Sequence, residues 1–381
     1  MPDSLSGMTY PQCFTYNSVN NRIYVGGAYG NCVIVIDGQT NQKIARIPTG
    51  SNNCDLCYNP TNNKIYSSNY YNNNVTIIDG ATNSVITTAT VGSSPLGLVY
   101  NPTNNKIYCA NHFSDNVTII DGANNSVITT VTVGSGPENL CYNSINNKIY
   151  CTNWNNNNIT IIDGITNNAI TNVTVGSGPI ALCYNSTNDK IYCANYNSNN
   201  VRIIDGAMNN VITILTVGSC PNALCYNSTN NKIYCANWSD NTVTIIDGAN
   251  NNLITTVAVG RYPIAFIYNL TQNRVYVANY YSSSVSVIRD VMPGIEEQST
   301  LNATGTMLEV YPNPAKSFFI IRLSQSADRL EIKMFDVAGK IIKSEELKGK
   351  NNRISLDGIK NGVYFIKVGD EIVKEKLVVT R

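Results

Sequence analysis

Residues 104–122 read NNKIYCANHFSDNVTIIDG, and close variants of this stretch return along the chain as far as residue 289. Its tyrosine belongs to a set of seven that are spaced 42 residues apart, with no insertion between any two repeats. The set is Tyr24, Tyr66, Tyr108, Tyr150, Tyr192, Tyr234 and Tyr276. Two residues before each of these tyrosines stands Lys or Arg, and twelve residues after each stands Ile. A fixed period of this length is the signature of a repeat architecture.

Each repeat divides into four short stretches with a preference for β-structure. In the third repeat they are Leu96–Tyr100, Lys106–Ala110, Val117–Ile120 and Val127–Val133. Turns rich in Asn, Asp and Gly separate them, and we expect the side chain of the Asp in each Asp-Gly turn to accept backbone N–H groups. Four antiparallel strands in each of seven repeats predict an all-β segment folded as a seven-bladed β-propeller. The last repeat lacks a clear fourth strand, so its outer edge is expected to be completed by Met1–Met8 or to stay short.

The Tyr-x-x-Asn step of the repeats carries a family resemblance. The step runs from Tyr66 to Asn69, from Tyr108 to Asn111 and from Tyr150 to Asn153. Asn-Asn-Lys-Ile precedes it and Thr-Ile-Ile-Asp-Gly follows it. In this order the motifs resemble the YVTN family of β-propeller repeats over residues 11–290. The first repeat departs from the family pattern, because Gly27 stands in the place of the Asn.

The composition disfavours several classes of function. The chain has 381 residues, of which 43% are hydrophobic and 13% are charged, and its 26 cationic and 25 anionic side chains leave a formal charge of +1. Such a chain has no net field to hold a polyanion, so nucleic acid is not an expected partner. No apolar run reaches the ~18–20 residues of a transmembrane helix. Because His112 is the single histidine, a histidine-rich metal site and a Ser-His-Asp triad lose support, and we expect neither metal nor cofactor.

The repeat stops near residue 290, where the charge pattern changes. We expect a propeller over residues 1–290, a linker over 291–307 and a separate domain over 308–381. The last segment holds 14 cationic and 10 anionic side chains, against 12 and 13 in residues 1–290. Strand-like runs without a helical stretch predict a small β-sandwich there. The runs are Phe318–Leu323, Leu330–Asp336, Lys340–Lys343, Arg353–Leu356, Gly362–Lys367 and Glu375–Val379.

Three ordered motifs characterise this C-terminal segment. They are VYPNPA with Pro312, Asn313 and Pro314, then FDVAGK with Asp336, Gly339 and Lys340, then GVYF with Gly362 and Tyr364. Together they are similar to the type A C-terminal sorting domain of the type IX secretion system. The resemblance implies contact with that secretion machinery and export to the extracellular space or outer surface of a Gram-negative bacterium. Residues 1–10 lack the basic and apolar parts of an export signal, so export also implies a processed or incomplete N-terminus.

A column of ring side chains four residues after the repeated tyrosine is the candidate binding site. Its members are Tyr70, His112, Trp154, Tyr196, Trp238 and Tyr280. The loop between the second and third strands of a blade emerges on the same face as the loop between blades, so we expect these rings around the mouth of the central channel. Aromatic faces edged by Asn, Ser and Asp suit sugar rings. Glu138 and Arg261 interrupt the repeat in the blade-connecting loops and are the expected specificity residues.

Three functions stay open at this point. The first is a secreted or cell-surface binding protein that recognises a glycan or a surface protein on the aromatic face, without catalysis. The second is a surface-layer or adhesion scaffold, in which the propeller is a spacer whose Asn-rich edges make lateral contacts and the rings only pack on prolines of neighbouring blades. The third is a polysaccharide lyase or hydrolase that uses Glu138, His112 and Arg261. We disfavour the enzyme because a catalytic site needs asymmetry that near-identical blades do not supply, and we predict no oligomeric state.

Most of the 12 cysteines occupy two repeating positions. Cys57, Cys141, Cys183 and Cys225 lie nine residues before the repeated tyrosine, and Cys109, Cys151, Cys193 and Cys235 lie one residue after it. Other repeats carry Thr, Val, Ser or Ile at these positions, so we expect small buried side chains. The alternative is cross-strand or inter-blade disulfides among the pairs Cys141/Cys151, Cys183/Cys193 and Cys225/Cys235.

Overall fold

The computed structural model describes residues 9–29, 31–289, 308–311, 315–336, 340–368 and 375–380. The chain divides into two compact units, Met1–Asp290 and Val291–Arg381. The predicted linker over 291–307 and the segment Met1–Met8 lie outside the described residues, as do Pro312, Asn313, Pro314 and Gly339 of the sorting motifs. In the described part of the chain, no helix has the length and apolar character needed to cross a membrane.

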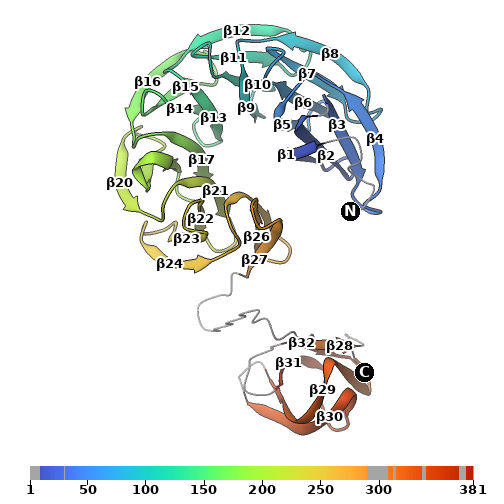
Figure 1. The fold of residues 1–381 in the computed structure, drawn as a ribbon. Helices are drawn as coiled ribbons and strands as arrows, with labels where there is room; N and C mark the ends of the chain where they lie inside the picture. Colours follow the sequence, from blue (N-terminus) through green and yellow to red (C-terminus); the bar gives the residue numbers. More distant parts are fainter. Residues whose placement is uncertain are drawn as a thin grey trace. The chain divides into compact units, whose positions relative to one another are not determined.

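The first unit consists of antiparallel sheets whose strands follow one another in chain order (Figure 1). The first blade has β1 (Thr9–Asn17), β2 (Arg22–Tyr29), β3 (Cys32–Asp37) and β4 (Lys43–Pro48). The second has β5 (Asn53–Asn59), β6 (Lys64–Asn69), β7 (Asn74–Asp79) and β8 (Val85–Thr90). The third has β9 (Pro95–Asn101), β10 (Lys106–Asn111), β11 (Asn116–Asp121) and β12 (Val127–Thr132). The fourth has β13 (Pro137–Asn143), β14 (Lys148–Asn153), β15 (Asn158–Asp163) and β16 (Ala169–Thr174).

The remaining blades repeat this plan. The fifth has β17 (Pro179–Asn185), β18 (Lys190–Asn195), the short 3₁₀ helix η2 (Tyr196–Ser198), β19 (Asn200–Asp205) and β20 (Val211–Thr216). The sixth has β21 (Pro221–Asn227), β22 (Lys232–Asn237), β23 (Thr242–Asp247) and β24 (Leu253–Ala258). The seventh has three strands in the described residues: β25 (Pro263–Asn269), β26 (Arg274–Asn279) and β27 (Ser284–Arg289). The predicted seven-bladed β-propeller is confirmed.

The core of the propeller lies between neighbouring blades. Side chains alternate between the two faces of each strand, so each inner blade buries one apolar set against the blade before it and another against the blade after it. Tyr66 and Ile77 of the second blade, for example, pack against Leu98, Ile107 and Ile120 of the third. Burial of each such aliphatic side chain contributes about 1.5–3 kcal/mol, which explains why the repeated Tyr and Ile positions stay apolar or aromatic.

The turns use Asn and Asp as expected. Asp79 Oδ1 accepts the backbone N–H groups of Ala81 at 2.8 Å and Thr82 at 2.9 Å, which confirms the turn role of the repeated Asp. The tight turn between the first two strands of a blade has Asn in the left-handed region, or Asp189 in the fifth blade, with φ of 51° at Asn63 and 52° at Asn105. Asn tolerates this conformation better than most residues, so the abundance of Asn follows from the turn geometry.

The repeated cations link each blade to the next by hydrogen bonds, a role that has no local signal in the sequence. Lys64 Nζ donates to the Gly122 carbonyl at 2.8 Å, the Ala123 carbonyl at 2.8 Å and Asn125 Oδ1 at 2.9 Å, all in the Asp-Gly turn of the following blade. Arg22, Lys106, Lys148 and Lys190 make the corresponding bonds. Burial lowers the pKa of Lys64, which is the expected effect of desolvating an ammonium group.

The two end blades each present one face without a neighbouring blade. Inner strands pack consecutively from β1 against β5 to β21 against β25, and no comparable packing joins β25 to β1 within the described residues (Figure 1). Phe14 and Tyr16 on the first blade are therefore 51% exposed, and Val285 on the seventh is 62% exposed. The equivalent side chains inside the array, Leu56 and Val243, are 6% and 0% exposed.

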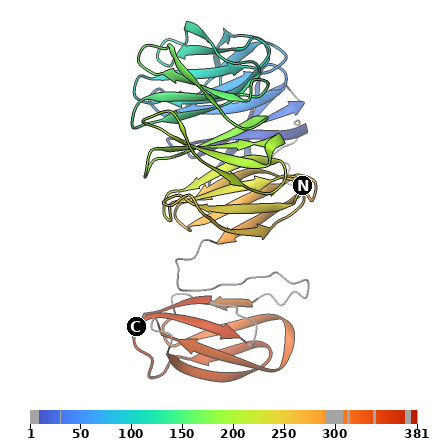
Figure 2. The same ribbon diagram turned by 90° about the vertical axis from the view of Figure 1, so that its left-hand side faces the viewer.

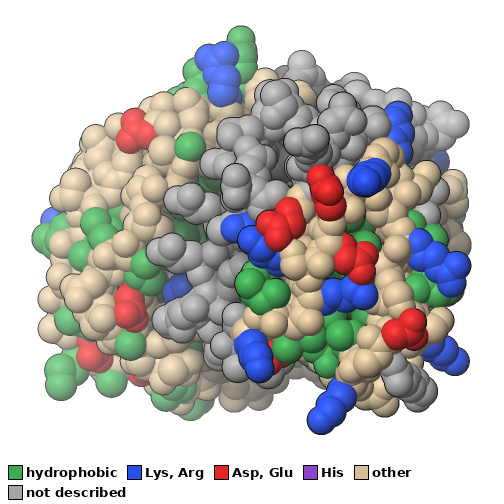
Figure 3. All heavy atoms as spheres, turned by 90° about the horizontal axis from the view of Figure 1, so that it is seen from below, with side chains coloured by type: hydrophobic (Ala, Val, Ile, Leu, Met, Phe, Trp, Pro, Cys, Tyr) green, Lys and Arg blue, Asp and Glu red, His purple; other side chains and the backbone are tan. Residues whose placement is uncertain are grey.

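The second unit is a five-stranded antiparallel sheet. Its strands are β28 (Leu308–Tyr311), β29 (Phe318–Phe335), β30 (Ile341–Ser355), β31 (Gly362–Val368) and β32 (Glu375–Val379). The order is β28-β29-β31-β32, with β30 on the other side of β29. Four short strands were predicted between residues 318 and 356, but the structure has two long ones, because register shifts within β29 and β30 keep them paired past the polar stretches. Residues 308–381 hold 14 cationic and 10 anionic side chains, and on the face drawn in Figure 3 the charged side chains gather on one part while the rest is mostly uncharged.

The described residues of the sorting motifs lie in a turn and at the start of a strand of this unit. Asp336 Oδ1 accepts the backbone N–H of Lys340 at 2.9 Å, and the Asp336 N–H donates to the Lys340 carbonyl at 3.0 Å. Gly362 begins β31 opposite Val379. The Tyr364 hydroxyl donates to the Lys360 carbonyl at 2.8 Å, and its ring is 8% exposed in the core. Within the described residues, Asp336 and Lys340 therefore close a turn, and Tyr364 packs in the core of this unit.

All 12 cysteines are free thiols. The register places Leu140 opposite Cys151 and Cys141 opposite Tyr150, so Cys141 and Cys151 point to opposite faces of their sheet. The same register separates Cys183 from Cys193 and Cys225 from Cys235. The disulfides considered for these pairs are wrong, and the expectation of small buried side chains holds for Cys109, Cys151, Cys193 and Cys235, each 0% exposed.

Candidate functional site

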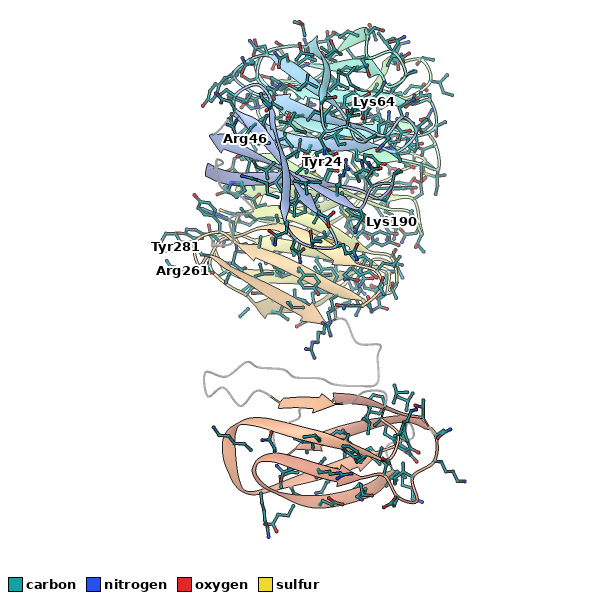
Figure 4. All side chains as sticks on the ribbon, turned by 90° about the vertical axis from the view of Figure 1, so that its right-hand side faces the viewer. Tyr24, Arg46, Lys64, Lys190, Arg261 and Tyr281 are labelled. Atoms are coloured by element: carbon teal, nitrogen blue, oxygen red, sulfur yellow. The ribbon has the colours of Figure 1, made fainter. Side chains whose placement is uncertain are left out.

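The loops that carry the candidate rings are hydrogen-bonded to the blade-connecting loops of the same blades. The Trp154 N–H donates to the Gly136 carbonyl at 2.8 Å, and the Trp238 N–H donates to the Cys220 carbonyl at 3.0 Å. Corresponding bonds fix Tyr70, His112, Tyr196 and Tyr280. Arg261 and Tyr281 project from this face of the propeller, whereas Lys64 and Lys190 lie toward the opposite face (Figure 4).

Five rings on this face form a continuous chain, which we call the aromatic arc. It consists of Trp154, Tyr196, Trp238, Tyr262 and Tyr281. The centroid separations between consecutive rings are 5.8, 6.3, 4.3 and 5.4 Å. The Trp238 and Tyr262 rings are stacked at 19°, and the other pairs are tilted or edge-on. The arc spans the fourth to the seventh blade, so its aromatic surface extends beyond a single pair of stacked rings.

A second, smaller group of rings lies in the second and third blades. Tyr70 contacts Tyr71 at a centroid separation of 5.1 Å and Phe113 at 6.3 Å, and Phe113 contacts His112 at 4.9 Å. No ring contact joins this group to the aromatic arc in the described residues. The rings predicted as a circle are therefore divided into two groups, and Tyr280, which is 58% exposed, belongs to neither.

The rings of the arc are partly packed and partly open to solvent. Trp154 lies against Gly178, where an added Cβ would be 3.2 Å from Cη2 of the indole. Trp154, Tyr196, Trp238 and Tyr262 are half-buried, whereas Tyr281 is 60% exposed. Packing on a neighbouring blade thus explains only part of each ring surface, and the remaining surface faces solvent.

Arg261 adds a cation to one end of the aromatic arc. Its guanidinium carbon lies 4.5 Å from the Tyr281 ring centroid and 5.9 Å from that of Tyr262. Such contacts orient the guanidinium, whose N–H groups can then donate to a hydroxyl or carboxylate of a ligand. The charge is exposed and therefore accessible.

His112 and Glu138 meet beside the smaller ring group. Nδ1 of His112 lies 3.5 Å from Oε1 of Glu138, and the two side chains are 17% and 25% exposed. Burial raises the pKa of Glu138 to about 6 and lowers the pKa of His112. The buried Nδ1 has no hydrogen-bond partner within the described residues.

Asp55, on the inner strand β5, has a structural role. Asp55 Oδ2 accepts the backbone N–H of Leu98 in the next blade at 2.8 Å, and burial raises the pKa of Asp55 to about 6. Asn139 stands at the same position two repeats later and accepts the N–H of Leu182 at 3.3 Å. The position therefore needs an acceptor oxygen, and a neutral amide supplies one. No group of three or more His, Cys, Asp or Glu side chains in the described ranges is arranged to hold a metal ion.

The chain resembles known proteins in both units. Residues 309–380 match the family described as "Secretion system C-terminal sorting domain", and residues 4–206 match the family described as "YNCE-like beta-propeller". Among solved structures, it resembles Kuenenia stuttgartiensis hydrazine synthase with a TM-score of 0.63 and 16% identity, over 75% of this chain and 97% of that chain, which is a likeness of fold alone. Among curated proteins, it is 32% identical to Beta-agarase A of Zobellia galactanivorans over 65 residues, which are 17% of this chain and 12% of the agarase.

The C-terminal match covers the segment in which the sorting motifs were found. A type IX sorting domain directs a protein to the cell surface or the extracellular space, and the prediction of that address is confirmed. The propeller match covers more than half of the chain. This protein belongs to the YNCE-like β-propeller family, and it carries a secretion system C-terminal sorting domain.

Proposed function

We propose that the propeller is a non-catalytic binding protein that recognises a glycan on the aromatic arc. The observation that carries the proposal is the unbroken contact of five rings, each with surface open to solvent, on one face of the propeller. The C–H faces of sugar rings stack on Tyr and Trp, and the surrounding polar groups take up the hydroxyls. Because the arc extends over four blades, it fits a chain of several sugar units better than one unit.

Affinity electrophoresis of the full chain against a panel of bacterial, algal and plant polysaccharides tests the proposal. We expect retardation by some members, and a roughly tenfold loss of affinity for each of Tyr196→Ala and Tyr281→Ala. Phe113→Ala is the matched control, because this ring is 68% exposed and belongs to the smaller group. Equal losses in all three variants, or none in any, would contradict binding on the arc.

A polysaccharide lyase or hydrolase is the second candidate, and the His112–Glu138 pair favours it. A carboxyl group whose pKa is raised to about 6, next to a histidine with an unused nitrogen, is suited to acid–base catalysis. Arg261, the third residue considered for catalysis, contacts Tyr262 and Tyr281 instead. Release of new reducing or unsaturated ends that is abolished by Glu138→Gln would establish the enzyme, and its absence across the panel would support the binding protein.

A further inference from the structure

The outer strands of five blades are sheet edges without protective residues. β8, β12, β16, β20 and β24 are each the last strand of their sheet and lie on the circumference of the propeller (Figures 1 and 2). They read VITTAT, VITTVT, AITNVT, VITILT and LITTVA, without a single charged residue or proline. An exposed edge offers unpaired N–H and C=O groups to another strand, and proteins usually blunt it with charges or proline.

The first blade shows the usual protection. Its outer strand β4 reads KIARIP, with Lys43, Arg46 and Pro48. The contrast is between repeats of the same chain, so the outer-strand position of the fold tolerates protective residues. Their replacement in the next five blades, mostly by Val and Thr, gives strands rich in residues of high β-propensity. These five edges are therefore suited to pairing, whereas β4 is not.

Each of the five edges also exposes an isoleucine at the same position, as β4 does with Ile44. These residues are Ile86, Ile128, Ile170, Ile212 and Ile254, and they are 42–47% exposed. Beside β12 runs an open groove of about 510 Å³, lined by residues 128–132 of that strand and residues 166–169 of the following blade. An added strand gains main-chain hydrogen bonds from an edge and side-chain contacts from such a groove.

We propose that these outer strands are docking edges through which copies of this chain pair, strand against strand. The strand that such an edge accepts is extended, uncharged and β-branched, and the edge of a second copy has this same character. Two identical edges can pair about a twofold axis, so that the unpaired N–H groups of each strand donate to the unpaired C=O groups of the other. The propeller segment 1–290 carries 12 cationic and 13 anionic side chains, so long-range repulsion between copies is small.

The number and placement of the edges determine the kind of assembly. Five edges point outward around one propeller, so pairing at one edge leaves the others open (Figure 1). Copies therefore associate into an extended lateral array instead of a closed dimer. The sorting domain directs the chain to the cell surface or the extracellular space. The aromatic arc lies on a different surface and stays open in this arrangement.

Sedimentation of the full chain from roughly 1 μM to roughly 1 mM tests the pairing, since a small interface dissociates in this range. The edge variant places Lys at the five exposed isoleucines: Ile86→Lys, Ile128→Lys, Ile170→Lys, Ile212→Lys and Ile254→Lys. The control places Lys at five exposed turn residues with the same change in charge: Ala81→Lys, Ala123→Lys, Ile165→Lys, Ala207→Lys and Ala249→Lys. We expect the mass of the wild type and the control to rise with concentration, and the edge variant to stay monomeric.

Hydrogen exchange of the wild type provides a readout that does not depend on the folding of any variant. Amides of β8, β12, β16, β20 and β24 are expected to exchange more slowly at high concentration, with no change at β4. The proposal is overturned if the wild type is monomeric at every concentration and these strands gain no protection as the concentration rises. The edges would then be available only to strands of other proteins. Association that persists in a folded edge variant overturns it as well, because the contact then lies elsewhere.

Discussion

Replacing Lys148 by Met tests whether hydrogen bonds from the repeated cations stabilise the contact between neighbouring blades. Nζ of Lys148 donates to the Gly206 carbonyl at 2.9 Å, the Ala207 carbonyl at 3.4 Å and Asn209 Oδ1 at 2.9 Å. All three acceptors belong to the fifth blade, whereas Lys148 is in the fourth. Met keeps the length and the apolar stem of the side chain, so the change removes the donors and little packing.

The expected loss follows from the number and kind of these bonds. A hydrogen bond from a charged donor contributes about 1.5–3 kcal/mol net, and a neutral one about 1 kcal/mol. The Gly206 carbonyl still accepts from Asn146 Nδ2 at 2.7 Å and from the Tyr150 hydroxyl at 3.2 Å, so it is not left unpaired. We therefore expect Lys148→Met to lower the free energy of unfolding by about 2 kcal/mol, and Tyr150→Phe to lower it by about 1 kcal/mol.

Urea unfolding of the full chain, followed by tryptophan fluorescence, measures both changes. The only two tryptophans are in the propeller, so the C-terminal unit does not contribute to the signal. Arg261→Met is the control, because it removes one exposed cation from the opposite face and is expected to change stability by less than about 0.5 kcal/mol. If Lys148→Met changes the free energy of unfolding no more than this control, the cations are solvated surface groups. Their hydrogen bonds would then not stabilise the contact between blades.

Three further results follow from the structure. Gly97→Ala should destabilise the propeller by about 1–3 kcal/mol, because its Cβ would lie 2.6 Å from the Glu138 carbonyl oxygen; an unchanged thermal midpoint would contradict this. Burial raises the pKa of Asp55 from 3.8 to about 6, so its contribution to stability is full below pH ~4 and is lost as pH rises through ~6. The stability of the wild type relative to Asp55→Asn should therefore fall over this range, and a constant difference would show that the carboxyl is not buried. Alkylation of the native protein should modify the half-buried Cys220 before the fully buried thiols of Cys109, Cys151, Cys193 and Cys235, and equal rates measured by mass spectrometry would argue against their burial.

Periodicity made the propeller predictable. The interval from Tyr66 to Tyr108 has the length of one four-stranded blade. Asn and Gly mark the turns between the strands. The Lys and Tyr columns were visible for the same reason, but their role was not. Lys64 bonds to Gly122, 58 residues away, and a contact between repeats has no local signal in the sequence.

The candidate site was less predictable than the fold. The shared face of the rings follows from the position of their loops, but their grouping depends on side-chain directions. Tyr262 stacks on Trp238, whereas Tyr280, which keeps the repeat position, makes no ring contact in the described residues. The open faces of the first and seventh blades were also not foreseen, because a repeat pattern is the same for a closed ring and an open one.

Fluorescence of the two tryptophans tests the binding face most directly. Trp154 and Trp238 are the only tryptophans of the chain, and both lie in the aromatic arc, so their emission reports on that face alone. Titration of the full chain with the polysaccharides that retard it should give a saturable shift in emission and protection from a soluble quencher. In a folded variant that combines Tyr196→Ala and Tyr281→Ala, the shift should be lost. An emission that stays constant while the polysaccharide binds would mean that the glycan lies elsewhere and that the arc only packs the blades together.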